Sequence, residues 1–286
     1  MVDFGRADYM KIYSALAAIA ILVTISFSIH DAHAVTYDFK DQASCRTISG
    51  TWNNLTSTCT ISSLWLNSGD LLTVDNSFLP YISLKVTDSL NNHGAIDISG
   101  SITINNSGIL NNNGSIANHC TGQCFGGTIQ NEGTITNNSN GTITTNSTIN
   151  NLGSINNFGT INNDGTIVNT GKVINNFKGI ITNSGTIHNN ELSAIINNGG
   201  NITNYATVIS DVSGTITNSG TIKNMCGGTF TSNGDFIGAQ VENVSCNAPQ
   251  NSSTVAEFPF AVPMLVMGFL SVIVFYKAKT RTLSHC

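Results

Sequence analysis

Residues 159–169 read Gly-Thr-Ile-Asn-Asn-Asp-Gly-Thr-Ile-Val-Asn, which is two copies of the short phrase Gly-Thr-Ile-x-Asn. The chain repeats this phrase from Asn91 to about Gln240, with little besides Asn, Gly, Ser, Thr and Ile between the copies. A short repeat at a near-constant period is typical of a solenoid, in which each unit buries its apolar side chains by stacking on its neighbours. The repeat therefore decides the architecture before any local propensity does.

The apolar residues of the repeat recur mostly at steps of six residues, and most of the remaining steps are eight residues long. This period does not fit the apolar spacing of an amphipathic helix, whereas it fits one short strand followed by a corner. In Gly159-Thr160-Ile161-Asn162-Asn163, strand alternation places Gly159, Ile161 and Asn163 on one face and Thr160 on the other. We therefore expect Ile to fill the interior and Thr to face the solvent.

The residues on either side of each strand predict how the corners are built. Gly before the strand permits a positive φ, and Asn after the strand tolerates the left-handed region and hydrogen-bonds to its own backbone. Coils stacked about 4.8 Å apart would bring these Asn side chains together. We expect them to form a ladder in which each amide donates to the next carbonyl.

These features predict an all-β fold, a single-stranded parallel β-helix solenoid with about 20 residues per coil and capped ends. Right-handed winding is favoured, although the run of six-residue steps from Ile143 to Val173 is equally compatible with a left-handed hexapeptide helix. Residues 35–81 are predicted to form an N-terminal cap and the first coils, and residues 82–246 the repeat domain with its C-terminal cap. Disorder is the competing interpretation of so polar a tract, and the even spacing of Ile argues against it.

The N-terminal segment, residues 1–34, is predicted to be a signal peptide. An apolar stretch from Ile12 to Ile29 ends in Ala32-His33-Ala34, the small-x-small pattern after which a signal peptidase cuts. The mature chain would then begin at Val35, with Ala34 as the last residue removed. An uncleaved N-terminal membrane helix is the alternative, and both interpretations predict export.

A second apolar run, residues 258–276, is long enough to cross a bilayer and follows a polar linker at 247–257. The basic tail at 277–286 is expected to stay in the cytoplasm, so that the rod is anchored in the plasma membrane and lies outside the cell. Glu257-Phe258-Pro259, followed by the apolar run and the basic end, resembles the PEF-type sorting tails of archaeal surface proteins. That resemblance implies a sorting transpeptidase, an archaeosortase, as a partner that cuts the tail and attaches a lipid.

The seven cysteines fit an exported protein. Pairing of sequence neighbours would join Cys45 with Cys59, Cys120 with Cys124 and Cys226 with Cys246, although the sequence does not fix the connectivity. A metal site at Cys120, Cys124 and His119 is the alternative. It is disfavoured because zinc prefers four ligands and a second closely spaced pair is lacking. We therefore expect disulfides, and neither a metal nor a cofactor.

Asn-x-Ser/Thr sequons are frequent in this Asn-rich chain, and Asn54 and Asn251 are the expected glycosylation sites because they lie at outward or cap positions. A sequon whose Asn lies inside the ladder cannot carry a glycan without disrupting the stack. We expect Asn201 to be such a residue. The chain is therefore predicted to be a glycoprotein modified at a few positions only.

The charge distribution disfavours a nucleic-acid partner. Charged residues make up 9% of the chain, the formal net charge is −5 at pH 7, and no Arg occurs between Arg46 and Arg281. A basic patch of the kind that binds phosphate backbones is therefore missing.

Catalysis has one candidate pair in the repeat region. Glu191 and Asp211 are one coil length apart and could stack at about 5 Å, the carboxylate separation of retaining glycosidases. Neither an aromatic platform nor an Arg accompanies them. We therefore expect the protein not to be an enzyme, with a glycan-active β-helix enzyme as an alternative.

A second alternative is a protein that binds ice or another crystal surface through rows of outward Thr. Four strands carry the Thr-x-Thr form that such a surface requires: Thr134-Ile135-Thr136, Thr142-Ile143-Thr144, Thr215-Ile216-Thr217 and Thr229-Phe230-Thr231. Most strands lack the second Thr, so the array is broken.

In architecture the chain resembles the filamentous-haemagglutinin-like β-helix class of surface adhesins, and its Gly-Thr-Ile-x-Asn tracts resemble those of archaeal surface proteins. The resemblance covers about Cys45 to Cys246. It implies a structural or adhesive cell-surface rod whose partners are the membrane, glycans or surface-layer proteins. Many weak contacts along the repeat would give such a rod avidity.

Overall fold

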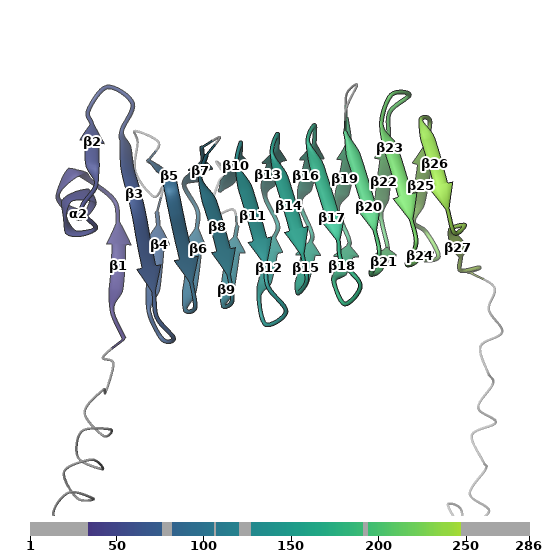
Figure 1. Cartoon of the computed structure of the whole chain (residues 1–286), viewed down its shortest axis with the longest axis horizontal. Helices are drawn as coiled ribbons and strands as arrows, with labels where there is room; N and C mark the ends of the chain where they lie inside the picture. Colours follow the sequence, from purple (N-terminus) through teal and green to yellow (C-terminus); the bar gives the residue numbers. More distant parts are fainter. Residues whose placement is uncertain (1–33, 76–81, 106, 120–126, 191–193, 247–286) are drawn as a thin grey trace, which may run out of the picture. The chain divides into compact units, whose positions relative to one another are not determined.

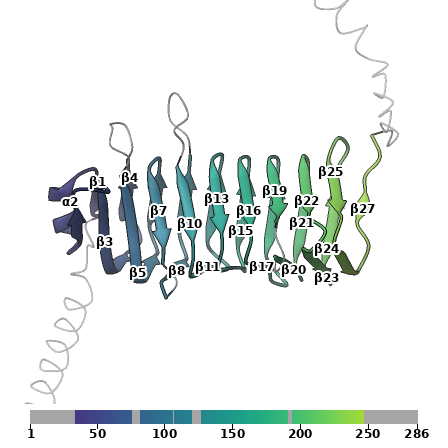
Figure 2. The same cartoon turned by 90° about the horizontal axis from the view of Figure 1, so that it is seen from above.

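The computed structural model describes residues 34–75, 82–105, 107–119, 127–190 and 194–246. They form an all-β parallel solenoid of about eight turns with about 20 residues per turn, which confirms the predicted fold and repeat length. Each complete turn contributes one strand to each of three faces, and the strands of a face lie side by side along the axis (Figures 1 and 2). The solenoid unit ends at Asn243, and Val244 begins a second unit.

Two predicted helices lie outside the described residues, namely the signal helix within residues 1–33 and the apolar run at 258–276. Within the described part of the chain, no helix has the length and apolar character needed to span a membrane.

We name the three faces A, B and C. Face A consists of β1 (Thr36–Phe39), β4 (Leu71–Val74), β6 (Ala95–Ile98), β9 (Ser115–Asn118), β12 (Thr142–Thr145), β15 (Thr160–Asn163), β18 (Ile180–Asn183), β21 (Asn201–Asn204), β24 (Thr221–Asn224) and β27 (Glu242–Asn243). Face B begins with the first halves of β3 (Thr58–Leu66) and β5 (Ser83–Asn92) and continues with β7 (Ser101–Ile104), β10 (Thr128–Asn131), β13 (Thr148–Asn151), β16 (Thr166–Asn169), β19 (Thr186–Asn189), β22 (Thr207–Ser210) and β25 (Thr229–Ser232). Face C begins with the second halves of β3 and β5 and continues with β8 (Ile109–Asn112), β11 (Thr134–Asn137), β14 (Ser154–Asn157), β17 (Lys172–Asn175), β20 (Ile195–Asn198), β23 (Thr215–Asn218) and β26 (Asp235–Gly238).

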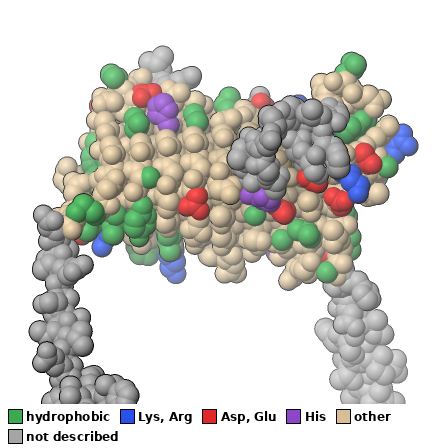
Figure 3. All heavy atoms as spheres, turned by 180° about the vertical axis from the view of Figure 1, so that it is seen from behind, with side chains coloured by type: hydrophobic (Ala, Val, Ile, Leu, Met, Phe, Trp, Pro, Cys, Tyr) green, Lys and Arg blue, Asp and Glu red, His purple; other side chains and the backbone are tan. Residues whose placement is uncertain are grey.

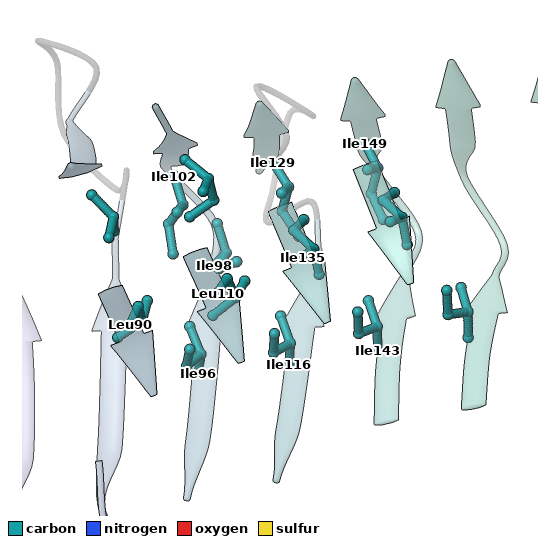
Figure 4. Close-up of a cluster of buried hydrophobic side chains, with 14 of the residues drawn as sticks. Leu90, Ile96, Ile98, Ile102, Leu110, Ile116, Ile129, Ile135, Ile143 and Ile149 are labelled. Carbon is teal, nitrogen blue, oxygen red and sulfur yellow. The ribbon is translucent and has the colours of Figure 1, made fainter. Parts of the chain in front are cut away.

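The interior is built by the second residue of each four-residue strand, as predicted. In β13, for example, Ile149 and Asn151 are buried whereas Thr148 and Asn150 face outward. The second-position side chains stack along the axis, and Figure 4 shows them from Leu90 to Ile149. Burying one such aliphatic side chain contributes about 1.5–3 kcal/mol, so this column is the main source of stability.

The predicted Asn ladder is present. Along face C the fourth-position amides donate to one another from Asn92 through Asn218, with Nδ2 to Oδ1 distances of 2.7–2.8 Å. Each amide also reaches a backbone carbonyl of the following coil, as Asn157 does to Ile180 at 3.1 Å. These side chains are buried, and their polar atoms would be costly if they were left without partners.

The predicted role of the corner glycines is wrong. Positive φ among the described glycines occurs only at Gly69, Gly227 and Gly238, and the Asn residues that end the strands do not adopt it either. A Cβ at Gly159 would instead overlap the carbonyl oxygen of Gly141 in the preceding coil. Glycine is therefore required at this corner because stacked coils approach each other closely.

A short helix and a hairpin close the N-terminal end of the solenoid. Helix α2 (Gln42–Thr47) is capped by Asp41, whose carboxylate accepts a hydrogen bond from the Ser44 N–H at 2.8 Å. Strand β2 (Thr51–Asn53) pairs with β3 in the antiparallel sense. The predicted Cys45–Cys59 disulfide joins α2 to β3 and is fully buried.

The last coil replaces Ile with aromatic residues, as expected of a terminal repeat. The rings of Phe230 and Phe236 pack edge to face with centroids 5.9 Å apart and cover the end of the aliphatic column. Cys226 and Cys246 are both disulfide-bonded. Cys120 and Cys124, for which a third disulfide is predicted, lie outside the described residues.

Candidate functional site

A surface groove of about 480 Å³ lies where face C turns into face A. Six residues from three successive coils line it: Asn138, Ser139, Phe158, Asn176, Phe177 and Lys178. We call it the Phe158/Phe177 groove. It fits a ligand site because it combines a hollow with exposed aromatic rings.

The groove results from unequal corner lengths. Residues 138–141 connect β11 to β12 and residues 176–179 connect β17 to β18, whereas only Phe158 and Gly159 connect β14 to β15 in the coil between them. The two four-residue corners project beyond the body next to β12 and β18 (Figure 1). The short corner therefore forms a floor between two longer walls.

The groove offers three kinds of contact. Phe158 and Phe177 are 43% and 84% exposed, and together they give the groove an apolar surface that a ligand could cover. Asn138, Asn176 and Ser139 add amide and hydroxyl groups. Lys178 is exposed, and among the residues that the structure describes no acidic side chain pairs with it.

The sequence analysis missed this groove, although a signal was present. Eight-residue steps, which mark longer corners, occur from Ile135 to Ile143 and from Val173 to Ile181. The six-residue step that begins at Ile155 falls between them on the same face. The difference between the six-residue and eight-residue steps predicts a groove only when the coils are aligned in register.

Face B carries a single unbroken column of outward hydroxyl groups. The first residues of nine successive strands stack in register: Thr58, Ser83, Ser101, Thr128, Thr148, Thr166, Thr186, Thr207 and Thr229. The third position beside this column is irregular, because it holds Val168, His188 and Ile209 on consecutive coils. The face therefore presents one regular row and not two.

The four Thr-x-Thr motifs do not form a lattice. Those of β11 and β23 lie on face C, that of β12 on face A and that of β25 on face B. Between β11 and β23 the face C strands begin with Ser154, Lys172 and Ile195. No two of the motifs are therefore on neighbouring coils of one face.

Of the predicted catalytic pair the structure describes only Asp211, so the pair stays a prediction. Asp211 bonds to a histidine, with its Oδ2 atom 3.0 Å from Nε2 of His188, and Glu191 lies outside the described residues. A second His–Asp pair joins Nδ1 of His119 to Oδ1 of Asp97 at 2.9 Å. Within the described ranges, no three His, Cys, Asp or Glu side chains gather in an arrangement that would hold a metal ion.

The modification sites predicted from the sequence fall in different places. Asn54 is exposed in the turn between β2 and β3, as a glycan acceptor must be. The prediction for Asn201 is wrong, because Asn201 is the first residue of β21 and points outward, while Asn204 occupies the ladder. Asn251 and the motif Glu257-Phe258-Pro259 lie outside the described residues.

Charged side chains are sparse on the described part of the face in Figure 3. Uncharged polar side chains and backbone make up most of this face, and the visible acidic and basic groups lie mainly toward the end at the right of the view. A ligand of this surface would therefore be held by hydrogen bonds and ring contacts more than by a strong field.

The fold and the repeated outer surface define a parallel β-solenoid repeat protein. A family model described as "Haemagglutinin repeat" matches residues 63–123, 125–191 and 192–224, more than half of the chain. The chain belongs to the haemagglutinin repeat family. Searches of curated proteins and of solved structures found no match. Repeats of this family suggest an extracellular, adhesin-like surface protein, and the family is typically non-enzymatic.

Proposed function

We propose that this protein is an exported, membrane-anchored adhesin that binds glycans through the Phe158/Phe177 groove. The observation that carries the proposal is the pair of exposed aromatic rings in a groove on a haemagglutinin-repeat solenoid. The solenoid itself acts as a stiff spacer, because its interior is an uninterrupted aliphatic column flanked by amide ladders.

The chemistry of the groove matches that of a sugar. One side of a pyranose ring is apolar and packs on an aromatic face, whereas its hydroxyl groups need donors and acceptors around the rim. Phe177 and Phe158 supply the rings, and the amides of Asn138 and Asn176 supply both donors and acceptors. The exposed ammonium of Lys178 would favour a glycan that carries a carboxylate.

A glycan array probed with the purified full-length protein tests this site. We expect the Phe158→Ala/Phe177→Ala double variant to lose at least about tenfold in affinity, since each ring contributes burial and stacking. Tyr205→Ala is the matched control, because Tyr205 is also a half-exposed aromatic residue but lies at the corner between faces A and B. Equal binding by wild type and double variant would contradict the proposal.

The membrane anchor has its own test. The apolar run at 258–276 supports a single-pass anchor and Glu257-Phe258-Pro259 supports a sorting step, so a chain that stops after residue 246 should be released into the medium. If the truncated protein stayed in the membrane fraction, the anchor would have to lie elsewhere. Surface-layer proteins are the other partners we propose, and crosslinking on intact cells would identify them.

A crystal-surface binder is a second candidate because of the hydroxyl column on face B. The nine residues from Thr58 to Thr229 present one group per coil in a regular row. A thermal-hysteresis assay should detect activity in the wild type, and Thr166→Val/Thr186→Val should reduce it. Absence of thermal hysteresis in the wild type would contradict the crystal-surface binder, and the adhesin would remain as the proposed function.

A further inference from the structure

Asp70 is the only acidic or basic residue that is buried among those the structure describes. Its exposed fraction is 3%, whereas every other buried polar residue is Asn, Ser or Thr. A carboxylate removed from solvent normally has a cationic partner or a full set of hydrogen-bond donors. Its surroundings therefore indicate what it is for.

Three N–H donors face the Asp70 carboxylate. The backbone N–H of Asn67 donates to Oδ2 at 2.7 Å, and the Asn67 side chain donates to the same atom at 3.3 Å. The other oxygen, Oδ1, accepts from the backbone N–H of Val35 at 2.8 Å. These bonds hold the pKa of Asp70 below its usual range, with the Val35 bond as the largest cause, so the carboxylate is charged at neutral pH.

Val35 is also the residue that follows Ala32-His33-Ala34, the predicted signal peptidase motif. Two independent observations thus meet at one nitrogen atom. The sequence predicts that the Val35 nitrogen becomes a free amine when the signal peptide is cut. The structure places the same nitrogen against the single buried carboxylate of the described chain. We propose that cleavage after Ala34 creates an α-ammonium group on Val35 that forms an ion pair with Asp70 and locks the first strand into the solenoid.

The covalent step is a hydrolysis catalysed by a signal peptidase. Water adds to the Ala34–Val35 peptide bond, Ala34 leaves with a carboxylate, and the Val35 nitrogen becomes an amine that takes up a proton. The nitrogen already donates to Asp70 Oδ1, so the ammonium keeps that bond and gains a full charge. Val35 lies at the surface with an exposed fraction of 42%, so the new ammonium would form at the edge of the solenoid and not in its interior.

The ion pair between Val35 and Asp70 would stabilise β1, because the pairing of β1 with β4 starts next to it. The Leu71 N–H donates to the Val35 carbonyl at 2.9 Å, and Thr36 is in register with Leu71. Strand β1 leads directly into α2, the helix that closes the end of the solenoid. An ion pair at Val35 would therefore complete the cap only after export.

Other charged groups near this turn are engaged elsewhere. On β1, Asp38 pairs with Lys40 at 3.0 Å, and on β6, Asp97 pairs with His119 at 2.9 Å. His93, in the neighbouring corner, stacks on Trp65 with ring centroids 5.1 Å apart. No cation of the described chain is paired with Asp70, so the ammonium would be its first.

The first measurement is the N-terminal sequence of the exported, full-length protein. We expect it to begin at Val35. A start at any other residue, or retention of the leader, would overturn the proposal.

The second measurement is the pH dependence of acylation of the N-terminal amine, followed by mass spectrometry. A free α-amino group titrates near pH 8, and pairing with Asp70 should raise its pKa. The pairing therefore stabilises the fold below about pH 8, and this contribution is lost as the pH rises through the higher folded-state pKa. In Asp70→Asn, acylation at neutral pH should be about tenfold faster if the pairing raises the pKa by one unit.

A one-residue insertion keeps the proposal testable even if Asp70→Asn folds poorly. Placing Ser between Ala34 and Val35 moves the ammonium about 3.8 Å along the chain and leaves Asp70 intact. The inserted variant should acylate at the fast rate of Asp70→Asn. Wild-type rates in the insertion variant, or in a folded Asp70→Asn protein, would show that the ammonium does not pair with Asp70.

Discussion

The first coils and the repeat coils solve the same packing problem with different side chains. On faces A and B, the inward fourth position of a strand is aliphatic in the first coils, as at Val74, Val86, Ile98 and Ile104. From β9 and β10 onward that position holds Asn, or Thr145 and Ser210, in every strand up to β24.

Aliphatic and amide side chains at the inward fourth position constrain the sequence differently. An aliphatic corner needs only volume, and its side chains can vary as Val, Leu or Ile do here. An amide corner needs a partner above and below, because a buried amide without a partner costs about 1–3 kcal/mol. The sequence is therefore varied in the first coils and nearly invariant in the repeat.

The boundary between the two regions shows this demand directly. The ladders of faces A and B begin at Asn118 and Asn131, which stack on Ile98 and Ile104. The Oδ1 atoms of both residues are buried without a hydrogen-bond partner in the described structure, as is Oδ1 of Asn163, which follows Thr145 within the face A ladder. Each ladder thus has an unsatisfied first member where it meets the aliphatic coils.

The largest effect is expected from Asn157→Leu, which breaks the face C ladder at its centre. The side-chain oxygen of Asn175 would lose its donor, and the side-chain amide of Asn137 would lose its acceptor. The branched Leu side chain would also crowd the corner between β14 and β15. Together these terms should lower the free energy of unfolding by about 3–5 kcal/mol. Urea denaturation measures the change.

Asn156→Leu is the control for this variant, because Asn156 is the outward neighbour of Asn157. A change within about 0.5 kcal/mol is expected there. If both variants were equally tolerated, the ladder would not be what distinguishes the repeat coils.

Next in size is the loss of the Cys45–Cys59 disulfide in a Cys45→Ala/Cys59→Ala variant. The bridge closes a loop with a sequence separation of 14, for which chain entropy gives about 3 kcal/mol. Because solenoid coils interact mainly with their neighbours, the loss should be local. Hydrogen exchange should accelerate in β1 to β5 and stay unchanged beyond β13, whereas uniform acceleration would show that the two regions unfold together.

The fold could be predicted from the sequence because its period is carried by single residues. In the repeat coils, an aliphatic residue equivalent to Ile161 marks each strand and an Asn equivalent to Asn163 marks nearly every corner, so register and ladder follow. The role of Gly159 could not be predicted, since it depends on how closely the coil below approaches. The orientation of Asn201 could not be predicted, because β21 carries Asn at both its first and its fourth position and only the strand boundary shows which of the two points inward.

The candidate sites were harder to predict for a related reason. Phe158 and Phe177 come together only because a short corner lies between two long ones in the same column. Asp70 and Val35 are separated by 35 residues and meet only through the pairing of β1 with β4. Neither the groove nor the Asp70–Val35 contact can be predicted from the residue spacing within one repeat.

A smaller effect is expected from Gly200→Ala, which probes how closely the repeat coils stack. A Cβ at Gly200 would overlap the Gly179 carbonyl oxygen, so the coils must separate at a cost of about 1–3 kcal/mol. Gly199→Ala is the control, since its Cβ would meet nothing closer than 3.5 Å. Thermal melting should distinguish the two, and equal melting temperatures would show that the corner can expand.

The smallest effect is a difference between two substitutions that carry an amide into the aliphatic region, Ile98→Asn and Val74→Asn. Residue 98 lies directly below Asn118, whose Oδ1 lacks a donor, whereas residue 74 lies between Phe39 and Ile98. Both variants lose apolar burial, but only the amide at position 98 can donate to Asn118 and extend the ladder downward by one coil.

We therefore expect Ile98→Asn to be less destabilising than Val74→Asn by about 1–2 kcal/mol in urea denaturation, although it deletes the larger side chain. Val74→Asn/Ile98→Asn should then cost less than the sum of the single variants, because the two amides can pair with each other. Strict additivity, or a larger cost at position 98, would mean that the ladder depends on the geometry of the repeat coils and not on the partner above. The first coils would then be unable to accept a buried amide at the fourth strand position. The backbone geometry of the coils, and not the available hydrogen-bond partner, would decide that the face A ladder begins at Asn118.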